Sequence, residues 1–178
     1  MKLKQLQHSS RAFSLVETSI GTAIGSIIMA AVMSLFIFGS RSFVAMGNYM
    51  DLDRTSRNAL DRMSRDIRQT RSLQSYASNQ LVFVDYDTNL LTFSWNKDTG
   101  QLTRTKGGQT TTLLTQCDYL NFHICQRNPI PGAFDFYPAT NNASIGKLVD
   151  LSWRCSRKIL GAKINTESVQ TAKIVIRN

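Results

Sequence analysis

The chain has 178 residues, a hydrophobic fraction of 42% and a formal net charge of +9 at pH 7. That length allows one compact domain beside an N-terminal apolar segment. Only two histidines occur, His8 and His123, and the sequence contains neither a nucleophile elbow nor a phosphate-binding loop, so it does not predict an enzyme or a bound cofactor. A basic excess can indicate nucleic acid or anionic lipid, but here it is spread along the sequence, so nucleic acid is not the favoured partner.

The first segment, residues 1–12, is a basic leader. It carries Lys2, Lys4 and Arg11 and no acidic residue. A positive flank before the first apolar run favours retention of that end in the cytoplasm and export of the rest. An ordinary secretory signal fits poorly, because no compact small-residue cleavage site ends the apolar run.

The second segment, residues 13–40, is apolar except for Glu17. The 23 residues from Thr18 to Ser40 carry no charge, which exceeds the roughly 20 residues that a helix needs to cross a bilayer. An ionised carboxylate inside such a segment costs several kcal/mol unless a cation neutralises it. A cut between Ala12 and Phe13 would create an α-amine four residues from Glu17, about 6 Å along a helix. That amine could neutralise the carboxylate of its own chain or of a neighbour.

The basic leader followed by the run Phe13–Glu17, with the sequence FSLVE, resembles the cleavage and methylation signal of type IV prepilins and type II secretion pseudopilins. The resemblance implies that a prepilin peptidase cuts between Ala12 and Phe13 and that Phe13 is N-methylated. It implies that Glu17 is the carboxylate that pairs with the N-terminus of an adjacent subunit during assembly. The family usually has glycine before the cut, so Ala12 is a departure that would permit slower processing.

The same resemblance implies a location and partners. The helix would lie in the inner membrane as a single pass through the lipid bilayer, with the C-terminal domain in the periplasm. Other pilin or pseudopilin subunits and the inner-membrane assembly platform would be its partners. Two other functions stay open: a DNA-binding minor pilin, and a membrane-anchored periplasmic binding or enzymatic domain that never assembles.

No proline occurs before Pro129, so the sequence predicts one continuous helix from Phe13 to about Arg71. Gly21 and Gly25 have the small-xxx-small spacing that permits close packing of membrane helices. The alternative is that glycine is simply common in such helices. Both explanations stay open.

Residues 41–75 are expected to form an amphipathic helix and a polar connector. The apolar residues at helical spacing are Met46, Met50, Leu60, Met63 and Ile67, and this stripe predicts a packing partner. Asp53 with Arg57 and Asp61 with Arg65 have the spacing of favourable ion pairs. The last turns are rich in arginine, at Arg62, Arg65, Arg68 and Arg71. They indicate either a solvated face or a contact face for acidic patches on neighbouring subunits.

Residues 76–178 are expected to form a β-rich globular domain. The expected strands are 81–86, 90–95, 101–105, 110–115, 119–125, 148–155 and 172–176. Together with the helix they predict an α+β fold with a long helix packed on an antiparallel sheet. This order resembles the pilin fold, and looks most like the J-class minor pseudopilins and the W-class minor pilins.

Three cysteines lie in the expected β domain. Cys117 and Cys125 bracket one strand and would be about 25 Å apart, so a bond between them is disfavoured. We expect Cys125 and Cys155 to pair if any two do. No cysteine pair has metal-binding CxxC spacing, and residues 85–89 match the start of a calcium loop too poorly to predict more than a hairpin turn.

Overall fold

The computed structural model describes residues 14–133, 135–158 and 167–176. One long N-terminal helix, α1 (Leu15–Gln69), is followed by an antiparallel β region, so the predicted α+β fold is confirmed. The chain divides into two compact units, residues 1–43 and 44–178. The β region begins at Thr70, earlier than the expected boundary at residue 76.

In the second unit α1 presents a buried stripe to the sheets. The residues of this stripe are Leu52, Ser56, Ala59, Met63 and Ile67. Their separations of three and four residues place them on one face of the helix. Met46 and Met50 were expected in the stripe, but they are 63% and 61% exposed, because the buried contact begins only at Leu52.

The helix ends where the first strand begins. Thr70 donates its hydroxyl hydrogen bond to the carbonyl of Ile67 at 2.7 Å, which satisfies one of the carbonyls left open at a helix C-terminus. Strand β1 (Thr70–Ala77) follows at once. The polar connector expected before residue 76 is therefore wrong, because these residues form β1 and Leu73 is buried in the core.

The first sheet is a five-stranded antiparallel meander in the order β1-β2-β3-β4-β5. After β1 its strands are β2 (Gln80–Asp85), β3 (Leu90–Asn96), β4 (Gln101–Lys106) and β5 (Gln109–Leu114). The predicted hairpin between 85 and 90 is confirmed: the Asp85 N–H donates to the Asn89 carbonyl at 3.0 Å. Asp85 itself forms an ion pair with Lys106, which lowers the pKa of Asp85 through their hydrogen bond.

The second sheet is a three-stranded antiparallel meander in the order β6-β7-β8. Its strands are β6 (Cys117–Gln126), β7 (Gly146–Ser156) and β8 (Glu167–Val175), and a short 3-10 helix η1 (Ala143–Ile145) precedes β7. The last strand begins earlier than the expected residue 172, so the sheet is longer than the sequence pattern indicates.

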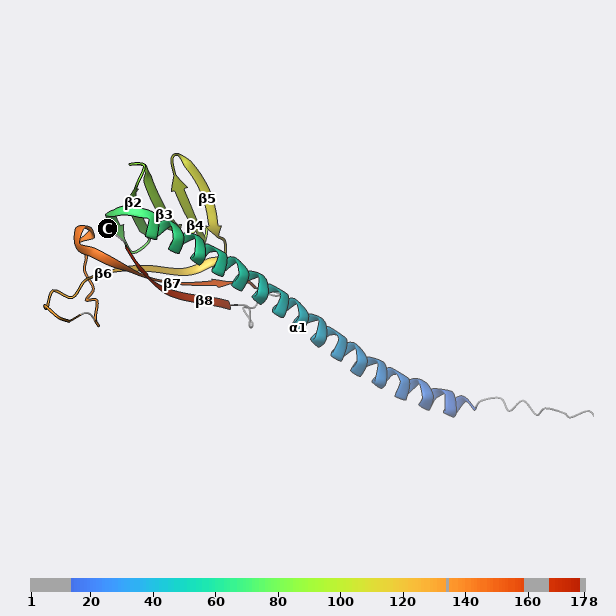
Figure 1. Cartoon of the computed structure of the whole chain (residues 1–178). Coiled ribbons are helices and arrows are strands. Elements are labelled where there is room, and N and C mark those ends of the chain that lie inside the picture. Colours follow the sequence, from blue (N-terminus) through green and yellow to red (C-terminus); the bar gives the residue numbers. More distant parts are fainter. Residues whose placement is uncertain (1–13, 134, 159–166, 177–178) are drawn as a thin grey trace, which may run out of the picture. The chain divides into compact units, whose positions relative to one another are not determined.

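Both sheets and the second half of α1 share one hydrophobic core. In Figure 1 this part of α1 runs between the sheet of β2–β5 and the sheet of β6–β8. Polar contacts attach the helix to each sheet. Arg104 Nε of β4 lies 2.6 Å from Asp66 Oδ2, and Gln170 Nε2 of β8 donates to Asp53 Oδ1 at 3.1 Å. The helix thus contacts both sheets, which also bond to each other directly, for example where the Tyr76 hydroxyl donates to the Phe122 carbonyl at 2.8 Å.

The burial contrast along α1 gives a direct test. Met63→Ala should lower the free energy of unfolding by about 2–5 kcal/mol, because it removes a fully buried side chain from the shared core. Met50→Ala is the matched control, with an expected change within about 0.5 kcal/mol. Denaturant unfolding of the purified full chain in detergent measures both, and equal losses would contradict the assigned stripe.

Candidate membrane and assembly segment

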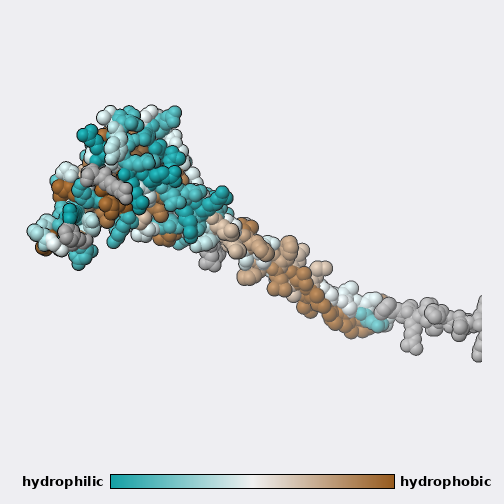
Figure 2. Space-filling model, viewed as in Figure 1, coloured by the Kyte–Doolittle hydropathy of each residue, from teal (hydrophilic) through white to brown (hydrophobic). Residues whose placement is uncertain are grey.

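The helix of the first unit is apolar on all sides. Its most apolar 18-residue window has a mean hydropathy of 2.2, and none of that window is buried within the chain. By length and composition, α1 is able to cross a membrane once. Figure 2 shows this apolar surface in brown along the helix, whereas most of the visible surface of the second unit is hydrophilic.

Several hydroxyl groups of this segment are bonded within the helix itself. Four side chains donate to a carbonyl three or four residues earlier at 2.8 to 2.9 Å, namely Thr18, Thr22, Ser26 and Ser34. In hydrocarbon, an unsatisfied polar group costs several kcal/mol. These bonds therefore make the hydroxyls compatible with an apolar surrounding.

Glu17 lies in the first turn of α1. From Ser14 to Ser40 it is the sole charged residue of the sequence. The partial positive charge of a helix N-terminus favours a carboxylate there, but no cation of the described residues forms an ion pair with Glu17. The predicted cleavage site Ala12–Phe13, and hence the expected methylated amine of Phe13, lies outside the described residues.

Gly21 and Gly25 follow Glu17 at successive intervals of four residues, so the three positions share one side of the helix. A Cβ atom added at either glycine would meet nothing within 4 Å. Packing inside this chain therefore does not require glycine at these positions. Their predicted role in close helix packing needs a second helix and stays a prediction.

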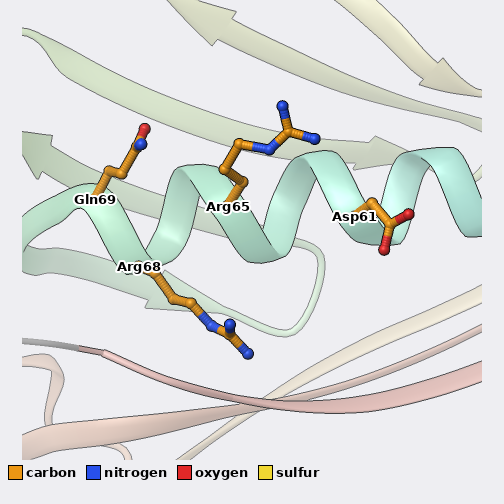
Figure 3. Close-up of a pocket in the computed structure, with 4 residues that line it drawn as sticks. All are labelled: Asp61, Arg65, Arg68 and Gln69. Carbon is orange, nitrogen blue, oxygen red and sulfur yellow. The ribbon is translucent and has the colours of Figure 1, made fainter.

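The exposed side of α1 in the second unit is rich in arginine. The expected pair of Asp53 and Arg57 forms, with Arg57 Nε 2.8 Å from Asp53 Oδ2. The expected pair of Asp61 and Arg65 does not form in the part of the chain that the structure describes. Figure 3 shows the Asp61 and Arg65 side chains pointing apart.

Arg65 and Arg68 are exposed and help to line a hollow of about 430 Å³, together with Asp61 and Gln69. Positions three residues apart are neighbours on a helix surface, although the two side chains diverge in the view of Figure 3. Neither arginine forms an ion pair within the described ranges. We call Arg65 and Arg68 the arginine face; its charge is available to an acidic partner.

The structure corrects the expected pairing of Cys125 with Cys155. Cys125 lies opposite Leu148, whereas Cys155 lies seven residues further along β7, roughly 23 Å away in an extended strand. A disulfide requires Cα atoms within about 7 Å. Cys117 is the residue opposite Cys155, and the structure contains all three cysteines as thiols.

Two of the polar contacts that were not predicted from the sequence are made by arginines. One is the Asp66–Arg104 ion pair, in which the side chains are only 13% and 10% exposed. The other involves Arg157, whose Nη2 lies 2.6 Å from Asp51 Oδ2 and whose Nε donates to Gln116 Oε1 at 2.7 Å. The sequence did contain a signal for the Asp66–Arg104 ion pair. Strand alternation places Arg104 on the same face as the buried Leu102, where a charged side chain needs a partner.

No protein-family model, curated protein or solved structure matches this chain. The geometry of the helix and of the β region therefore carries the functional argument.

Proposed function

We propose that this chain is a minor pilin or pseudopilin, a structural subunit of a type II secretion pseudopilus or a type IV pilus, and not a catalyst. The observation that carries the proposal is the position of Glu17. It is the single carboxylate in the first turn of a helix that stays uncharged through Ser40. The basic leader and the run Phe13–Glu17 precede and overlap this helix in the order that the prepilin signal has.

In this proposal the chain is made in the inner membrane with its leader in the cytoplasm and its β domain in the periplasm. Prepilin peptidase removes residues 1–12 and methylates the new terminus at Phe13. The assembly platform then transfers the helix from the bilayer into a filament, with this subunit at or near the tip.

The energetic argument concerns two opposite charges in hydrocarbon. The carboxylate of Glu17 or a chain-terminal ammonium alone would carry a burial cost of several kcal/mol. When the helix of one subunit lies beside the terminus of the next, each ion offsets the cost of the other. Gly21 and Gly25 lie on the same side as Glu17 and would allow the two backbones to approach.

The arginine face supports a partner other than a second copy of this chain. Arg65 and Arg68 of two identical chains would repel one another if the same faces met. Removal of residues 1–12 lowers the formal charge from +9 to +6, which leaves the mature chain basic. We therefore propose that the face contacts an acidic patch on a different subunit.

Intact-mass and N-terminal peptide analysis of the purified membrane protein tests processing. We expect a chain that begins at Phe13 and carries one methyl group on its α-amine. A chain that keeps Met1 and the leader would overturn the proposal and favour the non-assembling membrane-anchored domain.

Substitution of Glu17 tests assembly separately. Glu17→Ala should leave processing and folding intact but reduce incorporation into filaments by about tenfold or more, because a neighbouring amine loses a partner worth at least about 1.4 kcal/mol. Glu17→Asp is the matched control that keeps the charge and should retain part of the incorporation. Normal yield of the alanine variant in sheared filament fractions would refute the role of Glu17.

Charge reversal tests the arginine face. Arg65→Glu combined with Arg68→Glu should reduce the amount of co-purified partner subunits roughly 3- to 10-fold. The association should also depend less on salt, because the charges that attract the acidic partner are reversed. Lys97→Glu with Lys158→Glu makes the same charge change at exposed positions outside α1. Equal losses in both double variants would argue against a specific face.

The DNA-binding alternative rests on the same exposed arginines and has a distinct signature. If it holds, the full chain in detergent binds duplex DNA with an affinity that falls steeply as salt rises. We expect no such binding, and a steep salt slope that the Arg65 and Arg68 substitutions remove would favour the alternative.

A further inference from the structure

Cys117 and Cys155 lie directly opposite each other on β6 and β7. The Ser156 N–H donates to the Gln116 carbonyl at 3.1 Å, while the Cys117 N–H donates to Gly100 at 2.8 Å and not to its neighbour across the ladder. This pattern makes the two cysteines a non-hydrogen-bonded pair. In such pairs opposite Cα atoms are about 4.5 Å apart and the side chains are closest, which falls inside the range that disulfides accept.

Both cysteines are buried, with 0% and 1% of their surface exposed. They face the shared core, and the buried Ser168 of β8 lies opposite Cys155 in the same row of the sheet. A hydrogen bond between the two sulfurs raises the pKa of Cys117 and lowers the pKa of Cys155. The ladder register itself places the two side chains next to each other on one face of the sheet.

Cys125 is excluded as a partner for either residue. It lies opposite Leu148 near the other end of β6, and the sequence has no fourth cysteine. Burial raises the pKa of the Cys125 thiol, which keeps it protonated and a poor nucleophile.

We infer that Cys117 and Cys155 form an intrachain disulfide that fastens β6 to β7, while Cys125 stays a free thiol. Formation in the cell rests on the export proposed above, because disulfides persist in oxidising compartments. The bond would close the loop of residues 117–155, and a loop of that length restricts the unfolded chain substantially.

The oxidation requires a disulfide-bearing oxidant, either a small molecule or a protein. The thiolate of one cysteine attacks a sulfur of that disulfide and releases the other sulfur as a thiol. The second cysteine, as its thiolate, then attacks the mixed disulfide and releases the second thiol. The two cysteines lose two electrons and two protons, and the oxidant gains them. Because both cysteines are buried in the folded domain, the exchange takes place before the strands have packed.

Refolding of the purified full chain tests the bond independently of export. The reduced chain is unfolded, returned to native conditions in detergent with reduced and oxidised glutathione, and then alkylated in denaturant without a reductant. We expect one alkylated thiol per chain, on Cys125, and a linked peptide pair that contains Cys117 and Cys155. Three alkylated cysteines, or a linked pair that contains Cys125, would overturn the inference.

The stability of the oxidised chain provides a second readout. Reduction should lower Tm by roughly 10 °C, because the loop constraint on the unfolded chain is removed. Cys125→Ser is the matched control and should keep both the linked peptides and the oxidised Tm. An unchanged Tm on reduction of a linked chain would contradict the proposed stabilising role.

The same alkylation on protein taken directly from membranes separates the two proposals. A chain cut before Phe13 with three free thiols would refute the bond and leave the pilin proposal standing. A chain with an intact leader that links Cys117 to Cys155 on refolding would refute the pilin proposal and leave the bond standing.

Discussion

Both sheets pack against the buried stripe of α1, from Leu52 to Ile67. The five-stranded and three-stranded sheets share no ladder, and their inner faces meet in a core to which the helix contributes. Without the helix, apolar side chains of both sheets would face water. The stability of the β region therefore depends on the same helix whose N-terminal part is apolar enough to enter a membrane.

The distribution of apolar and charged residues around α1 changes along its length, so that its two parts suit different surroundings. Between Glu17 and Arg41 the helix carries no charge on any side, which suits lipid. After residue 44 only one stripe is buried, and the opposite side carries charged residues. The change needs no break in the helix, because it is made by composition alone. In the proposed filament subunit, α1 would thus serve as membrane anchor, as assembly element and as core helix.

The sequence predicted the features that follow from local patterns. The long helix, the hairpin at 85–90 and most of the strands depend on proline absence, alternation and turn residues, all of which are local. It failed where tertiary packing decided the outcome. Strand β1 was not predicted because its many polar residues are typical of a linker. Met46 and Met50 were wrongly assigned to the buried stripe because helical spacing does not show where along a helix the packing against a sheet begins. The cysteine pairing was wrong because β6 and β7 are antiparallel, which places Cys125 near the end of β6 opposite Leu148 near the start of β7, and leaves Cys155 opposite Cys117.

The internal bonding of the hydroxyls in α1 has a consequence for movement between surroundings. Thr18, Thr22, Ser26 and Ser34 keep their carbonyl partners whichever apolar neighbour surrounds the helix. Transfer of α1 from lipid to a protein environment would then break none of these four hydrogen bonds. Glu17 is the one ionisable group between Ser14 and Ser40, so it would dominate the electrostatic part of the free-energy difference between the two environments, and the exchange would be sensitive to the group beside it.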